Sequence, residues 1–309
     1  MKQLAKRVLV LHSSNDMYGA SRIVLQVIDI LIKAKYEVHV ILPYKGVLNK
    51  IITDKGASCS TCNLGVFRKK YLNLKGLYNR FLKIKKAKNH ISNYIDKHHI
   101  DLLYTSTSVI ISGALAAKKS SIPNISHIHE IPTANKSYEI FIGLFVRYFS
   151  KKVIVVSNSV AKHWQPYLKK NQLLKVYNGI IFPLLKTPDT TKKKIDQDII
   201  ITSIGRLIPG KGHKYFIEAA KELLILNNQY QFLIVGDTFP GYESYEEELK
   251  TVVIENDLHE KIHFLGYRTD IEAILAKSDL VFHSSITPDS LPTVLFEAIK
   301  MRVPVVATE

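Results

Sequence analysis

The stretch Ser203–Gly212 reads Ser-Ile-Gly-Arg-Leu-Ile-Pro-Gly-Lys-Gly and predicts a glycine-rich turn between a strand and a helix. It follows the apolar run Ile199–Ile204, typical of a buried strand, and precedes His213–Leu226, which has helical period. Glycine lets a backbone approach a ligand closely, and a helix N-terminus favours anions. Arg206 and Lys211 can therefore grip one diphosphate, the first as a planar fork and the second as a point charge. The alternative, a basic surface turn, stays open until the rest of the chain is considered.

Apolar runs alternate with helical segments along the whole chain, the pattern of doubly wound α/β domains. Ala20–Lys33 predicts a helix whose inner face carries Ile23, Val27, Ile30 and Leu31. Further helices are expected at Val109–Lys118, at Tyr138–Phe149 and after Ser157. The expected strands are Arg7–His12, Tyr36–Leu42, Asp101–Thr105, Asn124–His129, Lys152–Ser157, Val176–Ile180, Ile199–Ile204, Tyr230–Val235, Ile262–Leu265, Leu280–His283 and Val303–Ala307.

Residues 183–198 predict an interdomain linker, because two prolines and a run of three lysines interrupt a stretch without periodicity. We therefore expect a first Rossmann-like domain over residues 1–182 and a second over 199–309. Asp196-Gln197-Asp198 lies between linker and strand, so we expect no metal site there. The sequence stops directly after an apolar run, where a doubly wound domain normally continues into a covering helix. We expect the second domain to be incomplete and the chain to be C-terminally truncated.

The net charge of +16 is distributed unevenly along the 309 residues. Residues 1–186 hold 30 Lys and Arg against 8 Asp and Glu, whereas residues 187–309 hold 13 against 19. Such asymmetry indicates that the first half meets a polyanion, which can be a nucleic acid, an anionic membrane or both. No apolar run approaches the roughly 20 residues that span a bilayer, and the first run ends too early for a signal peptide. We expect a cytoplasmic protein.

The most basic stretch, Tyr71–His99, predicts an amphipathic helix at about 74–98. Asp96 is its only acid, and apolar residues that would form one side of the helix alternate with cations along the sequence. Such a helix can lie on an anionic membrane surface. The alternative is a solvated helix whose apolar side packs on its own sheet. A specific nucleic-acid partner is not expected, because no recognised binding module is present and aromatics do not interleave with the cations. The apolar positions are Leu74, Leu77, Phe81, Ile84, Ile91 and Ile95.

The order of motifs in the second half carries a family resemblance. The motifs are Gly205-Arg206-Leu207-x-x-x-Lys211-Gly212, Phe232–Asp237, Ile262–Tyr267, Pro288–Ala298 and Pro304–Thr308. Together they resemble the family-4 retaining glycosyltransferases, whose GT-B fold has two Rossmann-like domains facing each other across a cleft. The resemblance covers nearly the whole chain and implies α/β architecture and a nucleotide-sugar donor as substrate. We expect no cofactor, and no metal because the sequence has no convincing metal motif.

The resemblance also implies roles for residues of the second half. Arg206 and Lys211 would stabilise the leaving diphosphate, beside Gly205 of the same motif. Glu297, the second acid of a Glu-x7-Glu segment, would hold the ribose hydroxyls of the donor. The first acid, which contacts the donor sugar in the family, is Asp289 here, one methylene shorter, so a different sugar position or preference is expected. The other donor-binding positions of this segment are Leu291, Pro292 and Thr293.

In the first half the resemblance is looser. Gly19 keeps the glycine of the turn after the first strand, but the preceding glycine of the family is absent. His127-Ile128-His129-Glu130 resembles the segment that ends a strand at the cleft, which would put His129 near the reactive end of the donor sugar. Both histidines share a face if the strand is regular. The alternative for each is a structural histidine at a strand end.

The function that follows is retaining transfer of a sugar from a nucleotide-sugar to a saccharide, expected to be lipid-linked. The expected setting is bacterial surface polysaccharide assembly (O-antigen, capsule or exopolysaccharide), on the inner face of the cell membrane. Fixed cations would stabilise the diphosphate, the kind of preorganised electrostatics that often dominates catalysis. Two alternatives remain open: a nucleotide-sugar epimerase of the same architecture, and an inactive, truncated remnant.

Overall fold

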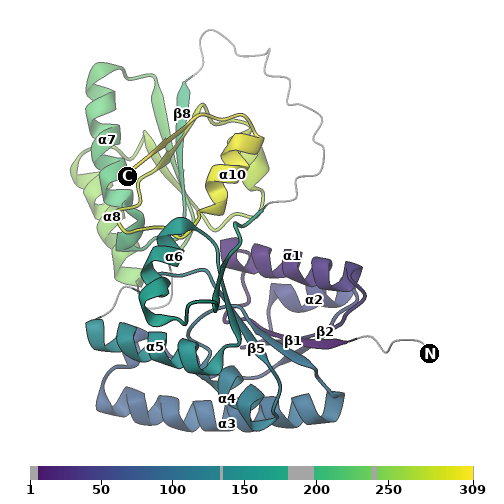
Figure 1. Cartoon of the computed structure of the whole chain (residues 1–309). Helices are drawn as coiled ribbons and strands as arrows, with labels where there is room; N and C mark the ends of the chain where they lie inside the picture. Colours follow the sequence, from purple (N-terminus) through teal and green to yellow (C-terminus); the bar gives the residue numbers. More distant parts are fainter. Residues whose placement is uncertain (1–5, 133–134, 180–197, 239–241, 309) are drawn as a thin grey trace. The chain divides into compact units, whose positions relative to one another are not determined.

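The computed structural model describes residues 6–132, 135–179, 198–238 and 242–308. Internal contacts divide the chain into two compact units, Met1–Gly179 and Ile180–Glu309 (Figure 1). The expected linker, 183–198, lies outside the described residues except for Asp198, and so does most of the Asp196-Gln197-Asp198 sequence.

The N-terminal unit is built on a seven-stranded sheet with the order β3-β2-β1-β4-β5-β6-β7. Every strand pairing described in it is parallel, and Val8 of β1 aligns with Val38 of β2 and Leu102 of β4. The strand order changes direction at β1, so the loops that leave β1 and β4 flank the switch point where such sheets bind ligands. The strands are β1 (Arg7–Leu11), β2 (Glu37–Leu42), β3 (Ser58–Thr61), β4 (Leu102–Thr105), β5 (Asn124–Ile128), β6 (Lys152–Val155) and β7 (Leu173–Lys175).

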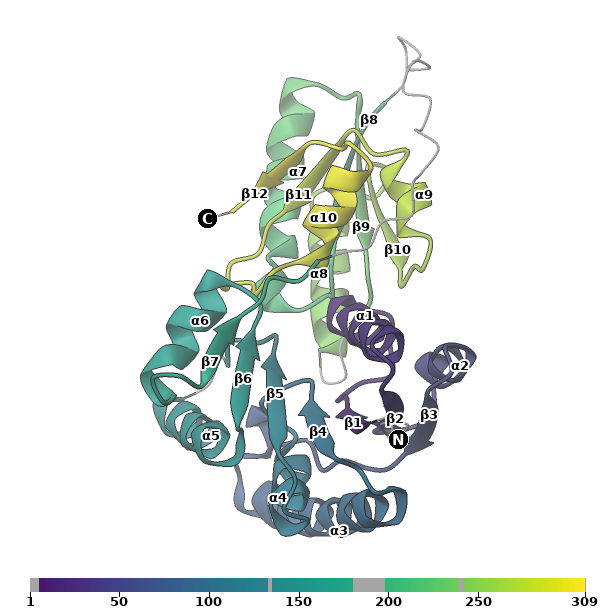
Figure 2. The ribbon, with the colours of Figure 1, turned by 45° about the vertical axis from the view of Figure 1, so that its right-hand side comes forward.

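Helices cover both faces of this sheet, because its strands are apolar on both sides. One hydrophobic cluster joins α1 and α2 to one face, and a second cluster joins α3 and α4 to the other (Figure 2). Asparagine or serine side chains cap the N-termini of α3, α5 and α6. The helices are α1 (Gly19–Lys33), α2 (Val47–Asp54), α3 (Leu74–His98), α4 (Ile111–Lys119), α5 (Lys136–Phe149) and α6 (Asn158–Trp164).

The C-terminal unit has a five-stranded parallel sheet with the order β10-β9-β8-β11-β12. Helices α7 and α8 pack on one face, and α9 and α10 pack on the other. Its switch point lies between β8 and β11. The elements are β8 (Ile199–Ile204), α7 (His213–Leu226), β9 (Tyr230–Val235), α8 (Glu243–Glu255), β10 (Ile262–Gly266), α9 (Ile271–Leu275), β11 (Leu280–His283), α10 (Thr293–Lys300) and β12 (Val305–Ala307).

Two sequence expectations are corrected, and two short elements were not expected at all. The expected strand at 176–180 is wrong: β7 precedes it, and residues 176–179 belong to no strand. The inner face of α1 is rotated from the expected stripe, since Ile30 is exposed whereas Val24 and Ile28 are buried. Helix α2 and strand β3 were not expected, because the helix is short and the strand is polar.

Among the described helices, none is both long and apolar enough to cross a bilayer.

Candidate active site

The glycine turn after β8 is fixed by the loop that follows β11. Gly212 has φ +68°, and a Cβ there would lie 1.8 Å from the Ser284 carbonyl oxygen. The Gly210 carbonyl accepts hydrogen bonds from the Ile286 amide at 3.0 Å and the Ser285 hydroxyl at 3.1 Å. Gly212 is therefore required for close backbone packing, and the hydrogen bonds to the Gly210 carbonyl join the turn to the loop after β11 at the switch point.

Lys211 and Asp289 form an ion pair at this turn, although 78 positions separate them in the sequence. His283, at the end of β11, places Nε2 3.4 Å from the same carboxylate oxygen, and the Ser290 amide donates to the other oxygen at 3.0 Å. Burial opposes ionisation of Asp289, but the adjacent His283 ring and the Lys211 charge outweigh it and lower the pKa of this carboxyl to about 2. The Asp289 carboxylate thus holds the Lys211 ammonium group in a fixed position beside the turn.

The backbone of Arg206 is positioned by His213, the first residue of α7. Nε2 of this imidazole donates to the Arg206 carbonyl at 3.1 Å, and Nδ1 lies 3.4 Å from the Ser203 hydroxyl. His213 is 1% exposed, and this burial lowers its pKa to about 4 even though the carbonyl favours the protonated ring. At neutral pH the ring is therefore uncharged, with its proton on Nε2 to satisfy the carbonyl.

The segment after Asp289 leads directly into α10. Pro292 precedes the first helical residue, Thr293, and both are half-buried, as is Leu291. Glu297 lies in the second turn of this helix and is 7% exposed, so it is not a solvent-facing helix acid. The structure thus brings Arg206, Lys211 and Asp289 to one turn, and places Glu297 eight residues later on the adjoining helix.

In the N-terminal unit, His129 lies just beyond β5, at the carboxyl edge of the sheet. Its ring centroid is 4.1 Å from that of His127, so the two histidines do share a face. Neither ring nitrogen of His129 has a hydrogen-bond partner among the described residues, and both are shielded from solvent. Burial, with the neighbouring His127 and His12, lowers the pKa of His129 well below its usual value. An uncharged ring with unused donor and acceptor atoms is suited to a polar ligand.

Glu130 ties this edge together. Its Oε1 accepts hydrogen bonds from the hydroxyls of Thr107 and Ser108 at 2.6 and 2.7 Å and from the Ser108 amide at 2.6 Å. Its Oε2 accepts from the His129 amide at 3.1 Å. One carboxylate thus joins the ends of β4 and β5 and fixes the backbone of His129.

Gly19 opens α1 at the same carboxyl edge. The preceding loop is held by Asp16, whose Oδ1 accepts hydrogen bonds from the Tyr18 amide at 3.2 Å and the Ser21 hydroxyl at 3.0 Å.

No group of three or more His, Cys, Asp or Glu side chains in the described ranges is arranged to hold a metal ion. Cys59 and Cys62 are free thiols, and burial raises the pKa of each.

Comparison with known proteins identifies the family. Residues 17–181 match the family described as Glycosyltransferase Family 4, and residues 187–309 match Glycosyl transferases group 1. The chain belongs to glycosyltransferase family 4. The family-4 assignment makes it a glycosyltransferase and agrees with the GT-B architecture of two Rossmann-like domains.

Relatives of this family-4 glycosyltransferase include enzymes of bacterial polysaccharide biosynthesis. The UDP-Gal:alpha-D-GlcNAc-diphosphoundecaprenol alpha-1,3-galactosyltransferase of Escherichia coli is 24% identical over 94% of this chain and 76% of its own length. The amylovoran biosynthesis glycosyltransferase AmsK of Erwinia amylovora is 28% identical over 37% of this chain and 29% of its own length. Anabaena Alr3699/HepE, solved with UDP and glucose, has a TM-score of 0.79 and 21% identity, covering 97% of this chain and 80% of that one.

Three contributors to the site of this family-4 glycosyltransferase were not predicted from sequence. His283 and His213 carry no local pattern beyond standing at the end of a strand and the start of a helix. Glu130 belongs to the His127–Glu130 motif, but the motif alone predicts no role for it. A polar residue at the carboxyl end of an otherwise apolar strand is the signal that could have indicated His283, since such ends converge at the switch point.

Proposed function

We propose that the protein is a retaining glycosyltransferase that uses a nucleotide-sugar donor. The observation that carries this proposal is the glycine turn, where Arg206 and Lys211 stand at the switch point of the C-terminal sheet, with Asp289 fixing the ammonium group. The family match and the UDP-bound relatives support the donor class. These cations would supply the positive charge that a leaving diphosphate needs, without requiring a metal.

The reaction follows from that charge. The acceptor hydroxyl would attack the anomeric carbon on the face from which the diphosphate departs, and its proton would pass to a departing phosphate oxygen. The new carbon–oxygen bond then has the configuration of the one it replaces. Glu297 is proposed to hold the ribose hydroxyls, and Asp289 to meet the donor sugar beside Gly205, Leu291, Pro292 and Thr293. In the N-terminal unit, His129, with Gly19 nearby on the same sheet edge, would offer an uncharged donor to a sugar hydroxyl.

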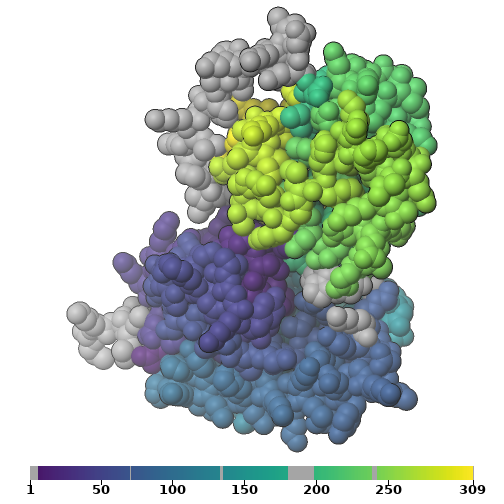
Figure 3. Space-filling model, turned by 180° about the vertical axis from the view of Figure 1, so that it is seen from behind, coloured from purple at the N-terminus to yellow at the C-terminus, as the bar shows by residue number. Residues whose placement is uncertain are grey.

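The acceptor is proposed to be a lipid-linked saccharide of bacterial surface polysaccharide assembly. The Escherichia coli relative is named for a diphosphoundecaprenol-linked acceptor, which supports this class. The two halves of helix α3 fit different interpretations of its sequence: the C-terminal half packs on the sheet, and the N-terminal half is exposed as a membrane-binding helix would be. Ala87, Ile91 and Ile95 pack on the sheet, as a structural helix would, whereas Leu74 and Phe81 are exposed. In Figure 3 the blue band that includes α3 lies at the surface. Peripheral binding to the inner face of an anionic membrane is proposed through this helix, 74–98.

Measurement of donor binding and turnover tests the donor assignment. A thermal-shift panel of UDP-, GDP- and ADP-sugars should show one base raising the unfolding temperature, because a ligand that binds only the folded state stabilises it. Arg206→Ala should lower transfer by about 100-fold or more, as does loss of an oxyanion donor. Arg268→Ala is the control, since Arg268 is an exposed arginine of the same unit paired with Asp270. Near-normal transfer by Arg206→Ala would refute its role, and an epimerised sugar formed from donor alone would favour the epimerase alternative.

A further inference from the structure

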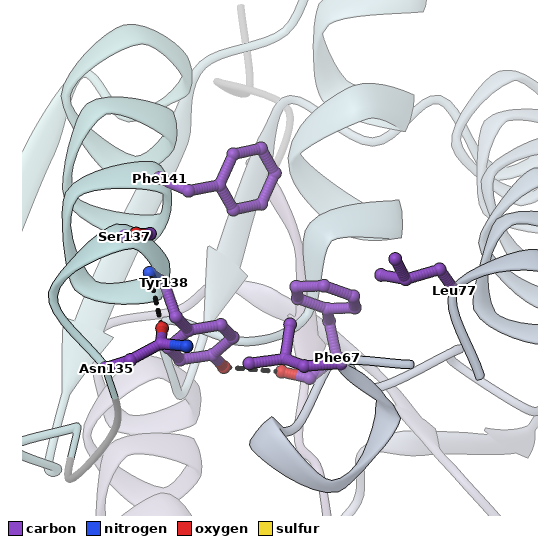
Figure 4. Close-up of a pocket in the computed structure, with 7 residues that line it drawn as sticks. Phe67, Leu77, Asn135, Ser137, Tyr138 and Phe141 are labelled. Atoms are coloured by element: carbon purple, nitrogen blue, oxygen red, sulfur yellow. Dashed lines mark hydrogen bonds between the residues drawn. The ribbon is translucent and has the colours of Figure 1, made fainter. Parts of the chain in front are cut away.

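An apolar pocket of about 330 Å³ lies between the first turns of α3 and α5. Figure 4 shows Leu77 from α3 on one side, Tyr138 and Phe141 from α5 on the other, and Phe67 between them. Phe67 and Tyr138 are buried and stack at 5.7 Å between ring centroids, whereas Phe141 and Leu77 are 49% and 42% exposed. The pocket therefore has a rigid aromatic floor and an open apolar rim, within the size range of ligand sites, about 300–1,000 Å³.

The polar groups that reach this pocket are largely engaged within the protein. The Tyr138 hydroxyl donates to the Phe67 carbonyl at 2.7 Å, and the Asn135 side chain caps α5 by accepting from the Tyr138 amide at 3.0 Å. Burial, together with the Glu130 carboxylate, raises the pKa of Tyr138 to about 12. A ligand of this pocket would consequently meet hydrocarbon rather than free hydrogen-bonding groups, which selects an apolar chain over a sugar or a base.

The surface around the pocket is cationic. Residues 61–90 contain nine lysines and arginines and no acid. Arg68 lies close enough to Tyr138 for its charge to act on that hydroxyl, whereas Lys136, exposed beside the capping residue, is paired with Glu139 at 3.6 Å. Four more apolar side chains of α3, Leu74, Tyr78, Phe81 and Leu82, are also exposed. Hydrocarbon surface beside a basic segment is complementary to an amphiphile with an anionic head group.

The position of the pocket distinguishes the acceptor from bulk membrane lipid. Both helices begin at the carboxyl edge of the N-terminal sheet, the edge that carries His129. The Phe67 amide donates to the Val109 carbonyl at 3.0 Å, and the adjacent Ser108 is bonded to Glu130, whose other oxygen holds the His129 amide. A hydrocarbon chain bound in the pocket would therefore leave it at the sheet edge that carries His129. The lipid tail of an acceptor has to lie near that edge, whereas the tail of a bulk membrane lipid does not.

We propose that this pocket binds the hydrocarbon chain of the lipid-linked acceptor next to its anionic phosphate. The inference rests on the proposed function for the identity of that lipid, but the chain-binding step is measured without donor. Dodecyl phosphate is the probe. Inorganic phosphate, which lacks the chain, and dodecyl maltoside, which lacks the anionic head, are the controls. The full chain should bind dodecyl phosphate at least about 10-fold more tightly than either control, because only that probe joins a chain to an anionic head.

A matched pair of variants locates the binding. Leu77→Gln and Leu82→Gln alter the same residue type on the same helix at nearly equal exposure, 42% and 41%, but only Leu77 lines the pocket. Leu77→Gln should weaken dodecyl phosphate binding about 10-fold, whereas Leu82→Gln should stay within about twofold of the wild type. Phe141→Gln should weaken dodecyl phosphate binding in the same way, because Phe141 lines the pocket on the α5 side. Ile140→Gln, the neighbouring position outside the pocket, is its control. Unchanged unfolding temperatures show that each variant is folded.

Photolabelling supplies an independent readout. Dodecyl phosphate with a diazirine near the chain end should label residues 67–77 and 135–141. Equal effects of Leu77→Gln and Leu82→Gln, or labelling elsewhere, would overturn the pocket assignment while leaving donor turnover and the Arg206→Ala result untouched. Conversely, labelled pocket residues in a protein that neither binds nor turns over nucleotide-sugars would refute the proposed function and retain the chain site.

Discussion

The contact between Lys211 and Asp289 is the residue-scale feature that shapes the candidate site. With His283 Nε2 3.4 Å from the same carboxylate oxygen, Asp289 lies between the Lys211 ammonium group and an imidazole ring instead of reaching freely toward solvent. The family's glutamate at this position would be one methylene longer. We infer that the shorter Asp289 side chain extends less far toward a donor sugar and instead holds Lys211 in place. This difference is a physical reason to expect an altered sugar preference.

Asp289→Asn tests the energetic side of this arrangement. The carboxyl has a pKa of about 2 in the folded protein against about 3.9 in an unfolded chain, so ionised Asp289 stabilises the fold above about pH 4 and this contribution is lost as the pH falls toward 2. Asp289→Asn should therefore lower the free energy of unfolding by about 1–3 kcal/mol at pH 7, and the difference from wild type should shrink below pH 4. Urea denaturation at several pH values measures both effects.

Asp270→Asn provides the comparison for that experiment. Asp270 also has a pKa of about 2, held down by the Arg268 hydrogen bond at 2.7 Å, but the pair is exposed. Exposed pairs contribute little because water screens them and the side chains lose entropy. Equal losses from the two substitutions would show that burial of Asp289 does not matter.

The individual site residues were predictable from sequence only where a motif carried them. Arg206 and Lys211 stand in a local glycine pattern, and the structure places both at one turn. The Lys211–Asp289 contact was not predictable, because it depends on β8 and β11 being neighbours in the sheet. His283 was missed for the same reason.

At the scale of elements, the glycine turn and the loop after β11 behave as one packed unit. Gly212 and Gly266 offer a matched test, since both belong to the C-terminal unit and have φ near +65°. A Cβ on Gly212 would collide with the Ser284 carbonyl, whereas a Cβ on Gly266 meets nothing within 4 Å. Both alanine variants bear the left-handed backbone cost of about 1–2 kcal/mol, but Gly212→Ala adds a clash of about 1–3 kcal/mol.

Urea denaturation of Gly212→Ala and Gly266→Ala should therefore show the first to be less stable by about 1–3 kcal/mol. Donor binding should weaken in Gly212→Ala alone, because the displaced turn carries Lys211. Equal stability of the two variants would mean that the loop yields without cost, and that the turn is not held as described.

Strands formed by apolar runs were predicted well, and the polar strand β3 was not. β8, β9 and β11 begin and end where the sequence indicated, because each is an apolar run flanked by turn residues. β3 has the polar sequence Ser-Cys-Ser-Thr and is a strand because it pairs with β2. The stripe of α1 was misjudged at Ile30, since helical period alone does not fix which face meets the sheet.

For the whole molecule, the charge asymmetry leads to a test of membrane binding. The cations of α3 would each gain about 1 kcal/mol near an anionic surface. Lys85→Glu with Lys86→Glu removes two such attractions and adds repulsion, so it should reduce flotation with anionic vesicles by at least about 30-fold in partition coefficient. Lys221→Glu with Lys277→Glu changes the net charge equally at exposed positions of the C-terminal unit and should have a much smaller effect. If both pairs reduce flotation equally, total charge rather than α3 attracts the protein, and if wild type floats equally with neutral vesicles, the electrostatic argument fails.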